Sequence, residues 1–362
     1  MGFKCGIVGL PNVGKSTVFN ALTMADVTTA NYPFCTIDPN IGVIPVPDHR
    51  LKKISDIVNS KQIIPAMVEF VDIAGIIKGA AEGEGLGNKF LANIREVQAI
   101  AHVVRCFDNS DIVHVSCKVD PKSDIEVINT ELILADLESV EKALNKIARA
   151  VKSGDKEAAA ELLLLNNVKD FLERGIPLRS SGFDLHSKIL NTLHLLTAKP
   201  IFYIANIAED GIEDNSYLKI IEKEAANDGA MVIPICATLE SEIAKLNEVD
   251  KVSFLMDLGL TKSGLDRVIY AGYKILGLQT FFTAGPREVR AWTISYATTA
   301  PQAAHVIHSD FSRGFICAEV VSYNDYIQFR GDSGAKAVGK LRLEGKDYIV
   351  QDGDVIHFRF NV

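Results

Sequence analysis

The apolar residues of the amino-terminal part of the chain form short runs, and each run ends in a loop of polar or glycine residues. Such runs lie at 3–8, 66–71, 101–107 and 200–205. Apolar runs of this length, separated by helical stretches, are typical of a mostly parallel sheet with helices on both faces. In such a sheet, ligands bind at the carboxyl ends of the strands. The pattern therefore predicts an α/β fold whose site lies in the loops after these runs.

A long helical insertion separates the third run from the fourth, between about residues 120 and 198. Apolar residues recur there at spacings of four and three, which predicts a heptad seam through Ile133, Leu137, Val140, Leu144, Ile147 and Val151. After a turn at 153–155, a second stripe runs through Ala158, Leu162, Leu165, Val168 and Leu172, and it stops before Gly175 and Pro177. We expect two antiparallel helices, which form either a protruding coiled-coil arm or a pair packed on its own domain.

The pattern changes at about residue 278 to short β-rich runs around one helical stretch at 301–309. Near the end of the chain, Asp352 and Gly353 stand between alternating apolar residues, which is a strong signal for a hairpin turn. The sequence therefore predicts a small α+β domain at 278–362. The first domain, at 1–277, contains the insertion at 120–198.

Residues 9–16 read G-L-P-N-V-G-K-S and match the phosphate-binding motif G-x-x-x-x-G-K-[ST] directly after a predicted strand. Glycines in this loop let backbone N–H groups point at phosphates, and the following helix adds its positive amino-terminal end. Lys15 is the candidate catalytic residue that holds the β- and γ-phosphates, and Ser16 is expected to bind Mg²⁺. The expected nucleotide contacts are Asn12, Val13, Gly14, Lys15, Ser16 and Thr17.

Two further segments have the order expected of a phosphate-sensing switch. Asp72 and Gly75 form a D-x-x-G motif at the end of a predicted strand, where the aspartate can reach the metal and the glycine N–H can sense the γ-phosphate. Thr36 lies between the phosphate loop and Asp72 in a proline-bounded polar stretch, as a switch ligand should. The predicted metal ligands are therefore Ser16, Thr36 and Asp72. The glycine-rich stretch at 76–87 is expected to be a mobile switch.

The residue after D-x-x-G bears on catalysis. Ras-like enzymes place a glutamine there to orient the attacking water, whereas this chain has Ile76, whose side chain offers no polar group. Slow hydrolysis is therefore expected unless another group helps. His114, in the polar loop after the third run, is the candidate for orienting or deprotonating water. The alternative is a histidine that only solvates its loop.

The fourth apolar run ends in Asn206-Ile207-Ala208-Glu209, where GTPases of this architecture carry N-K-x-D. Guanine recognition depends on an aspartate of one fixed length. Here Ile207 replaces the lysine, and the acceptor is Glu209, which is one methylene longer. Because a polar pair built to one geometry discriminates strongly, this change weakens the expected preference for guanine.

Together, these segments resemble the YchF subfamily of Obg-like ATPases over essentially the whole chain. The resemblance implies a P-loop NTPase of the translation-factor GTPase class, an α/β G domain with a coiled-coil insertion and a carboxyl-terminal TGS domain of ubiquitin-like β-grasp fold. It also implies a preference for ATP over GTP, with Asn206, Ile207 and Glu209 at the base, and association with the ribosome or ribosomal RNA.

Composition narrows the picture further. With 362 residues, 48% hydrophobic and 23% charged, and no apolar run near the length that spans a bilayer, the sequence predicts a cytoplasmic protein of two or three domains. Its six cysteines form no C-x-x-C pair, which argues against a zinc site or a disulfide framework. A net charge of −8 argues against general nucleic-acid coating. A local basic patch remains, with Tyr323 and Tyr326 beside Lys336, Lys340, Arg342 and Lys346.

The leading hypothesis is a slow, Mg²⁺-dependent ATPase that works as a nucleotide-gated switch, with ATP as substrate, a ribosomal partner and a monomeric state. Two alternatives stay open. One is a true GTPase of the Obg type. The other is a nucleotide-regulated binding module with negligible turnover, in which the helical arm and the carboxyl-terminal domain are the working parts.

Overall fold

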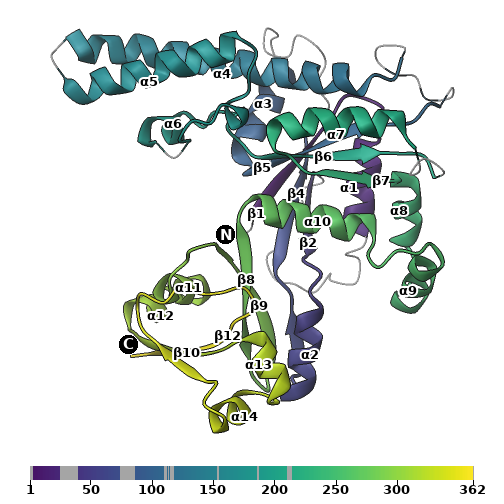
Figure 1. Cartoon of the computed structure of the whole chain (residues 1–362), viewed down its shortest axis with the longest axis vertical. Coiled ribbons are helices and arrows are strands. Elements are labelled where there is room, and N and C mark those ends of the chain that lie inside the picture. The colour runs from purple at the N-terminus through teal and green to yellow at the C-terminus, as the bar shows by residue number, and fades with distance from the viewer. Residues whose placement is uncertain are drawn as a thin grey trace. The chain divides into compact units, whose positions relative to one another are not determined.

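The computed structural model describes most of the chain (Figure 1). The described residues are 3–24, 40–73, 86–109, 112, 114, 118–152, 155–185, 187–209 and 214–361. Thr36, Gly75, Ile76 and most of the glycine-rich stretch lie outside them, so the predictions made for these residues stay predictions. Among the described residues, no helix is long and apolar enough to cross a membrane.

The chain divides into two compact units. The first consists of Met1–Ile44 and Glu69–Gly272, and the second of Pro45–Val68 and Tyr273–Val362. The sequence predicts a boundary at 277/278, whereas in the structure residues 45–68 also join the second unit.

The first unit is built on a six-stranded sheet in the order β2-β4-β1-β5-β6-β7. The strands are β1 Phe3–Val8, β2 Ile41–Pro45, β4 Met67–Asp72, β5 Ala99–Arg105, β6 Ile201–Asn206 and β7 Val232–Ile235. β1, β5, β6 and β7 pair in parallel, and every residue of β5 and β6 is buried. Strands buried on both faces read as continuous apolar runs, which is why the sequence pattern located this part of the sheet.

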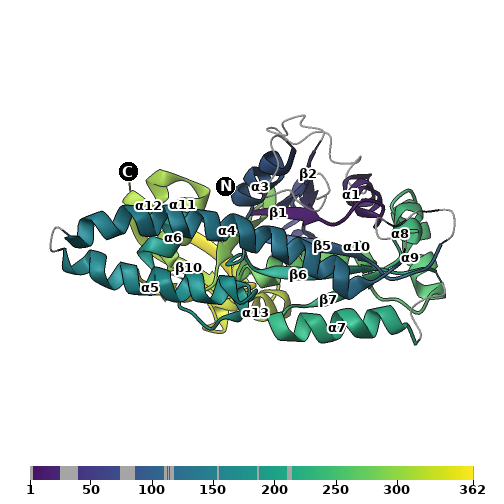
Figure 2. The same cartoon turned by 90° about the horizontal axis from the view of Figure 1, so that it is seen from above.

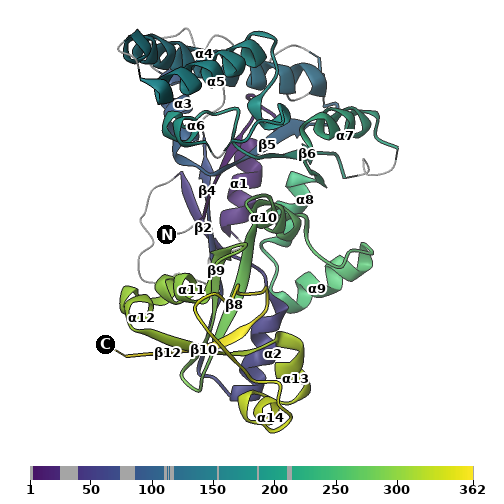
Figure 3. The same cartoon turned by 60° about the vertical axis from the view of Figure 1, so that its left-hand side comes forward.

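Helices cover both faces of this sheet, as predicted. They are α1 Lys15–Met24, α3 Leu86–Glu96, α7 Ser216–Asp228, α8 Ala237–Ile243, α9 Glu248–Asp257 and α10 Gly264–Ile275. Figures 1 and 3 show α3 and α7 on one face and α1 and α10 on the other. Residues that follow β1, Asp72 at the end of β4, and Ile112 after β5 line one cavity at the carboxyl ends of these strands, where the site was expected.

The insertion forms two long helices, α4 Pro121–Lys152 and α5 Lys156–Glu173, which lie side by side (Figure 2). Their shared core contains the seam residues Ile133 and Val140 from α4 and Leu165, Val168 and Leu172 from α5. The prediction of a helical pair is therefore confirmed.

Two arrangements were predicted for this pair, an arm and a pair packed on its own domain. Each fits a different part of α4. Its first turns bury Ile125, Ile128 and Leu132 where the helix packs against β5 and α7, whereas its later turns pack against α5. A buried carboxylate fastens α4 to the turn before β6, because Asp136 accepts from the backbone N–H groups of Leu196 and Thr197 at 2.8 Å each.

The second unit is a mixed sheet in the order β11-β10-β12-β8-β9-β3. Its strands are β3 Gln62–Ile64, β8 Leu278–Ala284, β9 Glu288–Ser295, β10 Phe315–Val321, β11 Arg342–Glu344 and β12 Val355–Phe360. Its helices are α2 His49–Val58, α11 Ala300–Ile307, α12 Ser309–Arg313, α13 Tyr323–Gln328 and α14 Asp332–Ala337. Residues 45–68 enter this unit because β3 pairs in parallel with β9 and because Arg50 on α2 binds Asp352 at 2.7 Å.

The predicted closing hairpin is wrong. The turn exists, with Gly353 at φ 89°, but β12 pairs with β10 and β8 instead of the preceding segment, in which Ile349 bridges Thr299. The polar residues of the turn explain this arrangement. Asp352 accepts from the N–H of Thr280 at 2.9 Å, and Asp354 accepts from the Tyr348 hydroxyl at 2.6 Å. The first of these bonds ties the turn to β8, which is the neighbour of β12 in the sheet.

Candidate nucleotide-binding site

The loop between β1 and α1 has a backbone that requires glycine at two positions. Gly14 has φ 94°, and a Cβ there would lie 2.2 Å from Nδ2 of Asn206. A Cβ on Gly9 would lie 2.7 Å from the carbonyl oxygen of Val103. Asn12, at φ 64°, also adopts the left-handed conformation, which asparagine tolerates better than most residues. The motif residues thus form a tight loop that leads into the amino terminus of α1.

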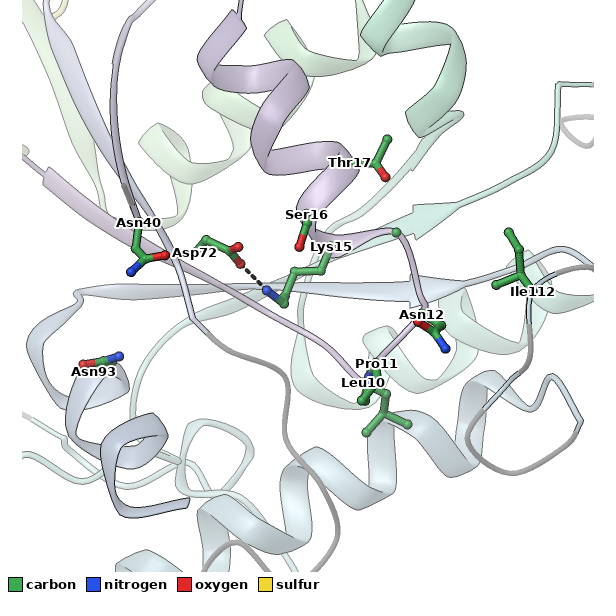
Figure 4. A pocket seen from close by; sticks show the side chains of 11 residues that line it. Leu10, Pro11, Asn12, Lys15, Ser16, Thr17, Asn40, Asp72, Asn93 and Ile112 are labelled. Atoms are coloured by element: carbon green, nitrogen blue, oxygen red, sulfur yellow. Dashed lines mark hydrogen bonds and ion pairs between the residues drawn. The ribbon is translucent and has the colours of Figure 1, made fainter. Parts of the chain in front are cut away.

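A cavity of about 690 Å³ opens beside this loop (Figure 4). That volume is in the usual range for small-ligand sites. Its lining residues are Leu10, Pro11, Asn12, Gly14, Lys15, Ser16, Thr17, Asn40, Asp72, Asn93 and Ile112. The structure therefore brings the predicted phosphate contacts and Asp72 to one cavity.

Lys15 and Asp72 form an ion pair in this cavity, and both side chains are largely buried. β4 positions Asp72 at its carboxyl end, and the backbone N–H of Asp72 donates to the carbonyl oxygen of Asn40 at 2.8 Å. The Ser16 hydroxyl lies at the start of α1, near this pair in Figure 4. One carboxylate and one hydroxyl fit Mg²⁺, which prefers oxygen ligands and takes few from the protein when phosphates supply the rest. In the described part of the chain, no group of three His, Cys, Asp or Glu side chains is placed to hold a metal.

Asn206 links the phosphate loop to the loop after β7. Its side chain is buried, with Nδ2 donating to the Val13 carbonyl at 2.9 Å and Oδ1 accepting from the Ala237 N–H at 3.1 Å. Ile207 is buried as well, and its N–H donates to Ile235 O at 2.8 Å. Glu209 is exposed. The predicted base contacts thus divide into two residues that hold the loops and one whose carboxylate faces solvent.

His114 is buried, with 3% of its side chain exposed, and its Nε2 lies 3.0 Å from Oδ2 of Asp124 in the first turn of α4. The alternative of a histidine that solvates its loop is therefore wrong. Burial raises the pKa of Asp124, and the neighbouring His114 opposes this shift. From the same loop, the cavity lining includes Ile112, two residues away from His114.

Arg105, at the end of β5, shapes this loop and was missed by the sequence analysis. The guanidinium is buried and donates to three carbonyl oxygens, those of Phe107 at 3.0 Å, Asn109 at 3.2 Å and Ile112 at 3.0 Å. An arginine inside a largely apolar run of the sequence is the signal that could have identified it, because a buried charge needs partners.

Asn40 and Asn93 are further lining residues that the sequence analysis missed. In Figure 4 their amides stand on the side of the cavity near Asp72. Neither belongs to a motif, and only the tertiary fold brings them to the cavity.

The prediction of a basic patch is wrong for one of its residues. Tyr326 is fully buried, so its ring is not available to stack on a nucleobase. Two of the basic residues also have acidic neighbours in their own unit, because Lys340 pairs with Asp325 at 3.6 Å and Arg342 with Glu344 at 3.1 Å. The patch is therefore less positive than its sequence suggests.

Two family models match the chain. One, described as a 50S ribosome-binding GTPase, matches residues 4–146. The other is named for the carboxyl-terminal part of YchF-type GTPases, is described as a protein of unknown function, and matches residues 278–361.

Curated relatives match from end to end. The chain is 60% identical to the protein named ribosome-binding ATPase YchF of Haemophilus influenzae, 56% to that of Escherichia coli O157:H7 and 55% to that of Bacillus subtilis, covering 100% of both sequences each time.

Two solved structures also match the chain over nearly its whole length. The YchF GTPase of Schizosaccharomyces pombe matches with a TM-score of 0.89 and 38% identity, over 99% of this chain and 98% of that one. A GTP-binding protein from Pyrococcus horikoshii matches in fold, with a TM-score of 0.61 and 21% identity over 99% of this chain and 100% of that one.

Proposed function

The chain belongs to the YchF family, and we propose on this premise that it is a slow, Mg²⁺-dependent ATPase that acts as a nucleotide-gated switch for a ribosomal partner. One observation carries the enzymatic part: Lys15, Ser16 and Asp72 line one cavity with the phosphate loop. The curated relatives are named for ATP hydrolysis and ribosome binding, which supports the substrate and the partner.

The proposed roles follow from this geometry. Lys15, whose ammonium group lies beside Asp72, would move onto the β- and γ-phosphates. Ser16, Asp72 and Thr36 would hold Mg²⁺, which neutralises charge on the phosphates when it is bound. The backbone N–H groups around Gly14, fixed by the bond from Asn206 to Val13, would point at the phosphates.

The proposed ATPase is distinguished from the Obg-type GTPase by base choice. In calorimetric titrations with Mg²⁺ and hydrolysis-resistant analogues, the ATP analogue should bind at least about tenfold more tightly than the GTP analogue, a difference of about 1.4 kcal/mol. Tighter binding of the GTP analogue would mean that Glu209 still reads guanine, and the chain would then be a GTPase.

Lys15→Ala separates the enzyme from a binding module with negligible turnover. We expect steady-state phosphate release from ATP to fall to background in this variant, because the charge on the γ-phosphate is no longer offset. Lys4→Ala, which removes a partly exposed lysine that pairs with Glu69 at the start of β1, is the control and should leave the rate unchanged. Equal rates in wild type and Lys15→Ala would contradict the ATPase.

We further propose that His114 positions the attacking water in place of the polar group that Ile76 lacks, with Asp124 orienting its imidazole. His114→Ala should lower kcat about 100-fold while the affinity for the ATP analogue changes little. Asp124→Asn should lower kcat less. Unchanged kcat in His114→Ala would leave His114 a structural residue.

For the remaining parts, we propose that the α4–α5 pair is a coiled-coil arm and that residues 278–362 form a TGS domain. Both would contact the ribosome or its RNA from a monomer in the cytoplasm. Charge reversal of Lys336 and Lys340 tests the RNA contact, since ribosome co-sedimentation should weaken if this face touches phosphates.

A further inference from the structure

A second cavity, of about 550 Å³, lies in the first unit where α4, α5 and α7 meet. It shares no lining residue with the cavity beside Lys15 among the described residues. No role proposed above uses it.

The floor of this cavity is aliphatic. Ile133 and Leu137 from α4 and Leu172 from α5 line it, and all three belong to the packed core of the helical pair or lie against it. Leu134, which also lines the cavity, keeps 40% of its surface exposed. The floor could therefore bury further aliphatic groups at about 25 cal/mol per Å² of apolar surface.

The rim of the cavity is acidic. Glu126 on α4, Glu173 at the end of α5, and Glu224 and Asp228 on α7 all line it, and no lysine or arginine does so among the described residues. Three separate helices thus contribute acidic residues to the lining of a cavity that also has aliphatic residues.

The carboxylates differ in the hydrogen-bond and ion-pair partners that they already have. Asp228 accepts from Tyr203 and Ser180 and is paired with Arg179 at 3.2 Å, so it belongs to the internal framework. Glu126 and Glu224 share Lys122 as their one ion-pair partner among the described residues, at 3.8 Å and 3.6 Å, and the Lys122 side chain is more than half exposed.

Glu173 has a similarly loose partner, since Lys169 lies 3.5 Å away and also pairs with Glu141. Exposed pairs of this kind contribute little to stability, so an incoming cation can displace either lysine. Glu224, with 23% of its side chain exposed, would gain most from a closer partner.

We propose that this cavity docks an extended basic segment of a partner protein, with an arginine or lysine between Glu126 and Glu224 and an aliphatic side chain on the floor. Charge complementarity selects this occupant. A nucleic acid or a free phosphate compound would be repelled by the rim. A purely apolar ligand would cover Glu224 without giving it a hydrogen bond, which costs free energy.

The test uses the full-length protein and fluorescence anisotropy of a short fluorescein-labelled peptide in which arginine and leucine alternate with glycine. The variant is Glu126→Gln combined with Glu224→Gln, which keeps side-chain size and removes the charge. Glu138→Gln is the matched control, because Glu138 lies on the same helix and also forms an i,i+4 pair with a lysine, but lies outside the cavity.

We expect the double variant to bind the peptide about tenfold more weakly, equivalent to about 1.4 kcal/mol, whereas the control binds like wild type. Leu134→Ser should weaken binding as well. A peptide with glutamine in place of arginine should bind poorly to every variant. ATP turnover should be the same in all of them, which separates this proposal from the proposed ATPase.

Equal affinity in wild type and the double variant would overturn the proposal, as would equal binding of the arginine and glutamine peptides. A wild-type dimer in sedimentation that becomes a monomer in the double variant would overturn it too, because a second copy would then occupy the cavity.

Discussion

His102 is a buried side chain without a hydrogen-bond partner among the described residues, at the centre of β5. The centroid of its ring lies 5.5 Å from the ring centroid of Tyr203. Burial, aided by the positive charge of Arg179 and opposed by Asp228, lowers the pKa of His102 from 6.5 to about 3. The imidazole is therefore neutral at pH 7 in the folded protein.

This residue should make stability depend on pH. A lowered folded-state pKa means that the unfolded chain binds the proton first, so stability is present above pH 6.5 and is lost as the pH falls toward 3. Between pH 7 and pH 5, the loss from His102 alone should be about 2 kcal/mol. Urea titrations of wild type and His102→Phe check this expectation. A variant that loses stability as steeply as wild type over that interval would refute it.

Among single residues, the sequence predicts the role of those whose function follows from a local pattern. Lys15 and Ser16 are predictable because the phosphate motif carries its own backbone geometry, and Asp72 because it ends an apolar run. Asn93 and Asp124 are not predictable, because each is brought to its neighbours by a helix whose orientation depends on packing far away in the sequence.

The α4–α5 pair is an element whose stability comes mainly from one apolar seam. Leu165 and Val168 on α5 are fully buried against α4, whereas Leu163 on the same helix is 65% exposed. Only one surface ion pair joins the two helices among the described residues, between Lys169 and Glu141. Such a surface pair contributes little to stability.

Leu165→Ala should therefore lower the free energy of unfolding by about 3 kcal/mol, since it removes buried surface and leaves a cavity. Leu163→Ala is the matched control on the same helix and should change it by less than about 0.5 kcal/mol. Urea denaturation followed by circular dichroism measures both. Similar effects in the two variants would show that the seam is not the stabilising feature.

Elements with strong periodicity were predicted well, and elements that depend on distant partners were not. The heptad spacing and the stop signal at Gly175 located the helical pair. The hairpin at Asp352 failed because alternation and a turn residue do not specify which strand pairs with β12. The transfer of 45–68 to the second unit depends on β3 meeting β9, more than two hundred residues later.

The whole molecule consists of two units with separate sheets and separate cores. All described residues around the phosphate loop belong to the first unit. Ligand that binds only the folded state stabilises what unfolds together with its site. The two units can therefore respond differently to nucleotide.

Hydrogen exchange with and without a hydrolysis-resistant ATP analogue and Mg²⁺ should show this difference. At a ligand concentration of about one hundred times Kd, amides in β1, β5 and β6 should gain up to about 2.7 kcal/mol of protection. Amides in β8 and β12 should gain much less. Equal gains in both sets would mean that the two units unfold as one.

The bond from Asn206 to Val13 has a consequence for protein engineering. Asn206 is one of the residues expected at the base, yet its side chain also holds the phosphate loop. Replacing Asn206 therefore changes the affinity for the triphosphate together with the base preference. A measured loss of nucleotide affinity would then combine both effects. Glu209, on the exposed side of the same loop, can be changed without disturbing those bonds, so a programme to convert the nucleotide preference should start there.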